Sequence, residues 1–100
     1  MLGHSRRLLT IVTEAALEGR LVQELERLGA HGWTITDARG RGSRGVRNSA
    51  WDASANVRIE VVCEPATAEA IADHLRERYA PNYAMILFLS DVLVLRPEKF

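Results

Sequence analysis

The hydrophobic pattern of the chain divides into short runs typical of strands and longer stretches typical of helices. Apolar or β-branched runs at residues 8–12 and 33–36 predict the first two strands. Residues 57–63 alternate between apolar and polar positions, which predicts a third strand with one buried face. Residues 84–89 predict a fourth strand. The apolar run 92–95, which follows a polar pair, is a candidate fifth strand.

Two helices are predicted between these strands. Leucines recur every three or four residues over 17–28 and form one apolar stripe, and Gly29 or Gly32 is expected to end this helix. A second amphipathic helix is predicted over 65–80. The order β-α-β, long loop, β-α-β is that of the split βαβ plan. We therefore expect an α+β, ferredoxin-like βαββαβ sandwich that forms one domain over residues 1–100.

The fourth predicted strand carries information about assembly. Every residue from 84 to 89 is apolar, so this strand offers hydrophobic side chains to both faces of the sheet. Two helices cover only one face of a four-stranded sheet, and the other would expose a larger patch than soluble monomers normally tolerate. We expect copies of the chain to associate through their bare sheets. The alternative is that segment 92–95 folds back over the sheet.

Positive charge is concentrated in one segment of a chain whose formal net charge is zero. Residues 39–47 hold four arginines and three glycines and no acidic residue. Glycine lets backbone N–H groups approach an anion closely, and the guanidinium fork matches phosphate oxygens. The spacing differs from that of a Walker-type loop. The segment predicts phosphate binding, and a solvated loop that carries arginines for solubility is the alternative.

The long connection over 39–56 is typical of a functional or mobile loop. Two or three arginines bound to phosphate offset the ordering cost of only a short stretch of backbone, so affinity requires a second, apolar pocket for a base. Trp51 lies within this connection and would be an exposed aromatic side chain unless it docks on a partner. We predict Trp51 as a partner contact.

The remaining composition limits the class of protein. Cys63 is the single cysteine, and the sequence shows no metal-ligand spacing, catalytic triad or paired carboxylates. The balanced charge, and the absence of aromatic residues from 8–12 and 57–63, argue against a nucleic-acid partner. The leading apolar run is too short to cross a membrane. We expect a cytoplasmic, non-enzymatic protein with no metal and no membrane insertion.

Three segments together resemble the PII-like signalling proteins: Gly-Trp-Thr at 32–34, the Arg/Gly segment at 39–47, and Asn-Tyr-Ala-Met-Ile at 82–86. The pattern Gly-x-Gly-Ser-Arg-x-Val-Arg is most similar to the branch that is encoded near bicarbonate transporters and carboxysomes and includes SbtB and the carboxysome-associated PII protein. The resemblance implies a homotrimer that binds adenine nucleotides in the clefts between subunits. It also implies that residues 39–56 form the mobile, partner-contacting T-loop.

Site residues follow from the resemblance by position. Those expected to hold the phosphates are Gly40, Arg41, Gly42, Ser43, Arg44 and Arg47. Those expected to shape the adenine pocket, partly through backbone groups, are Ile59, Glu60, Val61, Met85, Ile86 and Leu87.

The implied function is a regulator that senses AMP or ADP in inorganic-carbon metabolism, with ATP, cyclic AMP and bicarbonate as further candidate ligands. A bicarbonate transporter or a carboxysome-related protein is the candidate target. Residues 39–56 lack the tyrosine that is uridylylated in the loop of PII proteins, so nitrogen regulation through that modification is not expected. The alternative function is a weak nucleotide phosphohydrolase, for which the sequence offers no evident base or metal site.

Overall fold

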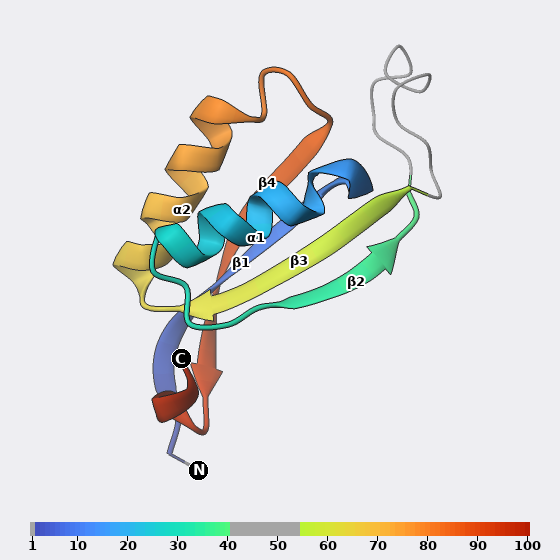
Figure 1. Cartoon of the computed structure of the whole chain (residues 1–100). Helices are drawn as coiled ribbons and strands as arrows, with labels where there is room; N and C mark the ends of the chain where they lie inside the picture. Colours follow the sequence, from blue (N-terminus) through green and yellow to red (C-terminus); the bar gives the residue numbers. More distant parts are fainter. Residues whose placement is uncertain (1, 41–54) are drawn as a thin grey trace.

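A computed structural model describes residues 2–40 and 55–100. Its core is a four-stranded antiparallel sheet with the strand order β2-β3-β1-β4, and both helices lie on the same face of that sheet (Figure 1). This architecture confirms the predicted α+β, ferredoxin-like order. The elements along the chain are β1 (His4–Glu14), η1 (Ala15–Leu17), α1 (Glu18–Arg27), β2 (Thr34–Ala38), β3 (Asn56–Cys63), α2 (Pro65–Arg78), β4 (Met85–Val94) and η3 (Pro97–Lys99).

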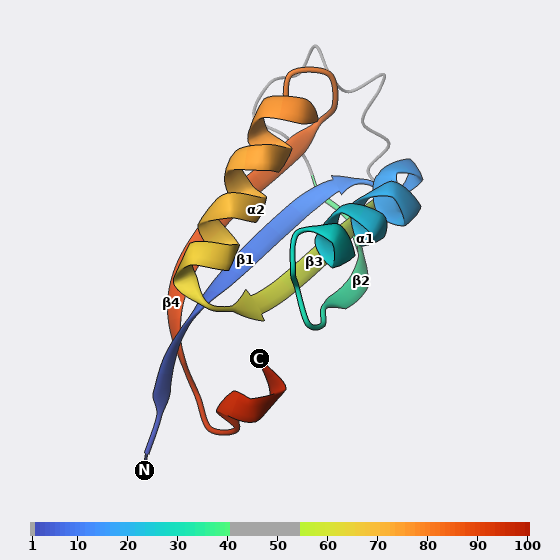
Figure 2. The same ribbon diagram turned by 60° about the vertical axis from the view of Figure 1, so that its left-hand side comes forward.

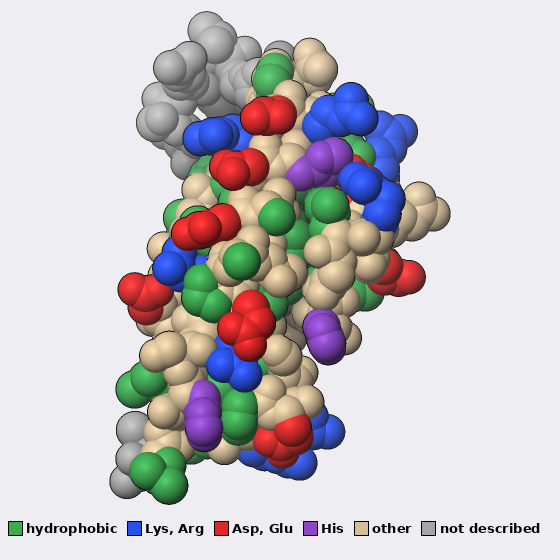
Figure 3. Space-filling model, turned by 90° about the vertical axis from the view of Figure 1, so that its left-hand side faces the viewer, with side chains coloured by type: hydrophobic (Ala, Val, Ile, Leu, Met, Phe, Trp, Pro, Cys, Tyr) green, Lys and Arg blue, Asp and Glu red, His purple; other side chains and the backbone are tan. Residues whose placement is uncertain are grey.

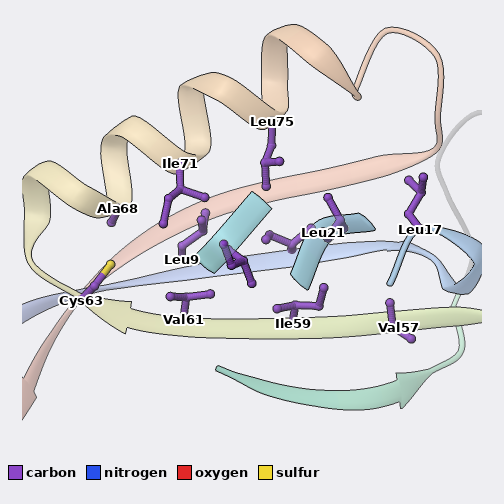
Figure 4. Packing of buried hydrophobic residues seen from close by; sticks show 12 residues of the cluster. Leu9, Leu17, Leu21, Val57, Ile59, Val61, Cys63, Ala68, Ile71 and Leu75 are labelled. Carbon is purple, nitrogen blue, oxygen red and sulfur yellow. The ribbon is translucent and has the colours of Figure 1, made fainter. Parts of the chain in front are cut away.

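The core lies between the sheet and the two helices. The strands pair so that Ile35, Ile59, Ile11 and Leu87 form one row across all four strands. Ile11 and Ile59, on the two central strands, are fully buried. Figure 4 shows the side chains of β3 and those of the helices pointing toward one another. The alternation predicted over residues 57–63 is therefore confirmed.

Helix α1 packs Leu21 and Leu25 into this core, and both side chains are fully buried. The helix ends at Gly29, which adopts the left-handed conformation with a φ of 96°. The Ala30 N–H donates to the Leu25 carbonyl at 2.9 Å, and the Gly29 N–H donates to the Glu26 carbonyl at 3.2 Å. This pair of bonds is a Schellman motif, which identifies Gly29 rather than Gly32 as the end of the helix.

Helix α2 begins with Pro65, whose missing N–H costs nothing in the first turn of a helix. Ala68, Ile71 and Leu75 are fully buried and point from α2 toward the sheet (Figure 4). No helix in the described parts of the chain is long and apolar enough to cross a membrane.

The end of β1 is tied to the start of β4 by two side chains. The Thr13 hydroxyl donates to the Ala84 carbonyl at 2.9 Å, and the Glu14 carboxylate accepts from the Ala84 N–H at 2.9 Å. Thr13 is fully buried, so its hydroxyl requires such a partner. Both backbone groups of one residue are thereby satisfied, which fixes the turn between α2 and β4 to the sheet.

The candidate fifth strand over residues 92–95 is wrong. Strand β4 is continuous from Met85 to Val94 and pairs with β1 along its whole length. The chain does not turn at Ser90-Asp91 because both residues stay in the β1–β4 ladder, opposite Leu8 and Arg7. The polar pair therefore continues the strand instead of interrupting it.

The alternative in which residues 92–95 cover the sheet is also wrong, since this segment belongs to β4 apart from its last residue. The chain turns back only after it, at η3, which Figure 2 shows beyond the end of β4 and set apart from the helices. Ile86 and Phe88 lie on the face of β4 opposite the helices and are 47% and 45% exposed. The described chain thus has the expected apolar side chains on an uncovered sheet face.

Candidate functional site

A hollow of about 370 Å³ lies on the sheet face that the helices leave uncovered. In the register, Leu8 is paired with Val62 and Thr34 with Glu60, and these positions alternate with the core residues Leu9 and Val61. We call this feature the Trp33 hollow. Its lining residues are Leu8, Gly32, Trp33, Thr34, Glu60, Val62, Lys99 and Phe100.

The lining of the Trp33 hollow combines flat or apolar walls with a few polar groups. Trp33 stands immediately before β2, and Phe100 approaches from the returning C-terminal turn. Thr34 supplies a hydroxyl, Glu60 a carboxylate and Lys99 an ammonium group. Apolar walls with a small number of polar groups are typical of small-molecule sites. The arrangement is suited to a planar, partly polar ligand.

Glu60 is the acidic group of this hollow. Its carboxylate lies 3.6 Å from the Arg58 guanidinium, and their side chains are 35% and 45% exposed. An exposed pair at this distance contributes little stability. The Glu60 carboxylate therefore stays able to accept a hydrogen bond from a ligand.

Thr10 lies beside Glu60 and Phe88 in one row across β3, β1 and β4. It is fully buried, and its hydroxyl has no hydrogen-bond partner among the described residues. A buried polar group without a partner costs about 1–3 kcal/mol. Side chains of its own chain cover this hydroxyl, so it is not an open contact point for a ligand or a partner.

The structure brings together only part of the predicted adenine pocket. Glu60 lines the Trp33 hollow, whereas Ile59 and Val61 are fully buried in the core between sheet and helices. Met85, Ile86 and Leu87 open β4 and pair with the end of β1, so they do not line the hollow.

Of the predicted phosphate contacts, Gly40 lies within the described residues and the others do not. Gly40 is described and exposed, with open space around it. Strand β2 runs from Thr34, which lines the hollow, to Ala38, which precedes the Arg/Gly segment. At the usual rise per residue of a strand, this distance is about 13 Å. The other predicted phosphate and partner residues lie outside the described residues: Arg41, Gly42, Ser43, Arg44, Arg47 and Trp51.

Sequence reasoning missed most of the lining of this hollow. Leu8, Trp33, Thr34 and Val62 were not among the predicted site residues, although strand alternation contains the signal for Val62. A strand presents every second side chain to one face, so Glu60 shares its face with Val62 and not with Ile59 or Val61. The contribution of the C-terminal turn has no sequence signal that we can identify.

Cys63 lies at the end of β3 and is 3% exposed, as expected for a small core residue. Burial, with a further contribution from the Glu64 charge, raises the pKa of its thiol. Within residues 2–40 and 55–100, no group of three or more His, Cys, Asp or Glu side chains is placed to hold a metal ion.

Comparison with known protein families identifies the family of this chain. Residues 6–99 match the family model described as nitrogen regulatory protein P-II. The chain belongs to the P-II family. It is therefore a PII-like regulatory protein, and the resemblance read from its sequence is confirmed at that level. Its placement in the SbtB and carboxysome-associated branch stays a prediction.

Solved structures of P-II relatives agree with this assignment. A PII-like signaling protein of Thermus thermophilus, TTHA0516, is 46% identical, with a TM-score of 0.83 over 100% of this chain and 99% of that one. CPII of Thiomonas intermedia, bound to ADP and bicarbonate, is 24% identical, with a TM-score of 0.83 over 99% and 97% of the two chains. CPII bound to ADP, AMP and acetate is 22% identical, with a TM-score of 0.85 over 100% and 98%. At these identities CPII shows that the fold is shared.

Proposed function

We propose that this P-II protein senses adenine nucleotides, with AMP or ADP as the principal ligand and ATP or cyclic AMP as further candidates. The observation that carries the proposal is the Trp33 hollow, whose aromatic wall and Glu60 carboxylate suit a planar base with an amino group. CPII, which has the same fold, has been crystallised with ADP and AMP.

The base would lie against Trp33 with its amino edge toward Glu60. Aromatic rings stack on bases, and adenine presents an exocyclic N6 amino group that donates hydrogen bonds. The Glu60 carboxylate accepts such a bond. Guanine presents the O6 acceptor at the equivalent position, which a carboxylate repels. With the base in this orientation, Glu60 favours adenine over guanine.

The phosphates would be held by the Arg/Gly segment of a neighbouring subunit, because AMP and ADP are too short to reach from the Trp33 hollow along the whole of β2 to the segment of the same chain. Gly40, Arg41, Gly42, Ser43, Arg44 and Arg47 remain the proposed contacts, on the sequence argument that glycine N–H groups and guanidinium forks match phosphate oxygens. Residues 39–56 would act as the T-loop that reports occupancy, and Trp51 is its proposed partner contact.

We further propose a homotrimer in which a neighbouring subunit closes each nucleotide cleft. Ile86 and Phe88 are exposed on the open sheet face. A second copy packed on this face would cover the apolar side chains. It would also make each site a shared one, so that occupancy of one subunit can be sensed by its neighbour.

The physiological setting follows by analogy with CPII and with the sequence resemblance. CPII has been crystallised with bicarbonate as well as ADP. We propose bicarbonate as a second ligand and inorganic-carbon metabolism as the process, with a bicarbonate transporter or carboxysome-related protein as the target. A single buried cysteine and adenylate ligands fit a cytoplasmic protein.

Calorimetric titration with AMP, ADP, ATP, cyclic AMP and GDP, with and without bicarbonate, tests this function. We expect Glu60→Ala to weaken ADP binding about tenfold, the equivalent of about 1.4 kcal/mol, and to reduce the preference for ADP over GDP. Arg44→Ala is expected to weaken ADP binding further, because it removes a charge-assisted contact to phosphate.

Glu77→Ala is the matched control, because Glu77 is exposed on α2, on the helix side of the sheet. It should bind ADP like the parent. The proposal fails if no adenylate binds below about millimolar, which corresponds to about −4.1 kcal/mol. It also fails if Glu60→Ala and Glu77→Ala behave alike.

A further inference from the structure

A second hollow, of about 490 Å³, lies between α1 and α2 on the opposite side of the sheet from the Trp33 hollow. We call it the Arg20 hollow. Figure 3 shows Lys and Arg side chains gathered around a histidine on this side of the molecule. Its lining residues are Arg20, Glu24, Arg27, His74, Arg78 and Tyr79.

Glu24 is the acidic residue of this hollow, and neighbouring side chains already form hydrogen bonds with its carboxylate. The Arg27 Nε donates to one carboxylate oxygen at 3.0 Å, and the Tyr79 hydroxyl donates to the other at 3.4 Å. The His74 Nε2 contacts the same oxygen as Tyr79. Burial raises the pKa of the Glu24 carboxyl, but hydrogen bonds from His74 and Arg27 outweigh burial and leave that pKa below its usual value. Glu24 is thus a fixed anion with little capacity for a further cation.

Two arginines remain without a carboxylate of their own. Among the described residues, neither Arg20 nor Arg78 forms an ion pair, although both act electrostatically on the Tyr79 hydroxyl. Burial and the Glu24 charge raise the pKa of Tyr79, so its hydroxyl stays protonated and keeps its hydrogen bond to Glu24. Three arginines against one glutamate leave two uncompensated positive charges even when His74 is neutral.

Like charges that converge on one hollow repel one another unless an anion neutralises them. Arginines on a helix surface are often simply solvated, but here Arg20 and Arg78 come from two different helices and line the same hollow. The side chains that line the hollow carry mainly guanidinium, imidazole, carboxylate and phenol groups. The hollow is therefore poorly suited to a base and well suited to a compact, strongly charged group.

We propose that the Arg20 hollow binds a phosphate group, either inorganic phosphate or the phosphate of a small metabolite. Arg20 and Arg78 would supply paired donors from their guanidinium forks, while the Tyr79 hydroxyl keeps its hydrogen bond to Glu24. A tetrahedral phosphate has enough oxygens to accept from both arginines, and guanidinium binds it in two-pronged geometry. This site is separate from the proposed nucleotide site because the sheet lies between them.

Nuclear magnetic resonance can resolve the two sites in one titration. The ¹⁵N-labelled protein is titrated with sodium phosphate at constant ionic strength, and the backbone amides and arginine Nε–H groups are followed. We expect saturable shifts at Arg20, Arg78 and Tyr79. The double variant Arg20→Gln/Arg78→Gln is expected to bind phosphate about tenfold more weakly or not at all.

Arg76→Gln is the matched control, because Arg76 is exposed on the same helix, pairs with Asp73 and does not line the hollow. It should titrate like the parent. The double variant should keep its ADP affinity, so failure at one site is distinguishable from failure at the other. Glycerol 3-phosphate distinguishes the sources: tighter binding than phosphate assigns the site to a metabolite, and weaker binding assigns it to free phosphate.

Phosphate binding at this hollow is supported whether glycerol 3-phosphate binds more tightly or more weakly than inorganic phosphate. The proposal is overturned if the shifts at Arg20, Arg78 and Tyr79 do not saturate. Equal titrations of the double variant and the parent would also overturn it. The double variant must retain the parent's dispersed amide spectrum, which shows that its fold is intact.

Discussion

Replacing Ile59 with alanine is expected to lower the free energy of unfolding by about 2–5 kcal/mol, the range for removing a large buried aliphatic side chain. Ile59 is fully buried in the centre of β3, in the row that contains Ile35, Ile11 and Leu87. The substitution leaves a cavity that touches both neighbouring strands and the helices above them. Urea unfolding followed by circular dichroism measures the loss.

The same measurement on two further variants calibrates the result. Ile59→Val removes one methylene and should cost about 0.5–1.5 kcal/mol. Leu2→Ala removes a side chain that is 87% exposed and should leave the stability within about 0.5 kcal/mol of the parent. If Ile59→Ala were as mild as Leu2→Ala, Ile59 would not lie in the core.

Phe88→Asp is expected to convert the proposed trimer into monomers. Phe88 is 45% exposed on the open sheet face, on β4 and in the row that contains Thr10. If copies of the chain pack on this face, the substitution buries a carboxylate without a partner, which costs several kcal/mol. Sedimentation equilibrium should give three times the 11.2 kDa chain mass for the parent and one chain mass for the variant.

Ala70→Asp provides the control for added charge. Ala70 is exposed on α2, on the helix side of the sheet, where no contact between subunits is proposed. This variant should keep the mass of the parent. A parent that sediments as a monomer, or an assembly that survives Phe88→Asp unchanged, would contradict packing through the open face.

The order of elements was predictable because its signals are local. The alternation over residues 57–63 and the leucine spacing of α1 follow from one buried face in each element, and the structure confirms both. The error at residues 92–95 has a long-range cause. Ser90-Asp91 looks like a turn in sequence, but strand pairing with Leu8 and Arg7 of β1 continues through it, and those partners lie far away along the chain.

The candidate site was less predictable than the fold for the same reason. Glu60 was identified, but most of its neighbours in the Trp33 hollow come from other parts of the chain: β1, β2 with the turn before it, and the C-terminal turn. Contiguous residues such as Ile59 and Val61 are natural candidates when a motif is carried over by position. In a strand they face the opposite side, so alternation identifies Val62 as the neighbour of Glu60, and only the register identifies Leu8.

The most direct test of the account is the fluorescence of Trp33 during ADP binding. The chain has two tryptophans, so Trp51→Phe leaves Trp33 as the only reporter. The account predicts a saturable change in Trp33 emission with the same midpoint as the calorimetric titration, and a midpoint about tenfold higher when Glu60→Ala is added. Calorimetric binding of ADP with no change in Trp33 emission would place the nucleotide elsewhere and contradict the account.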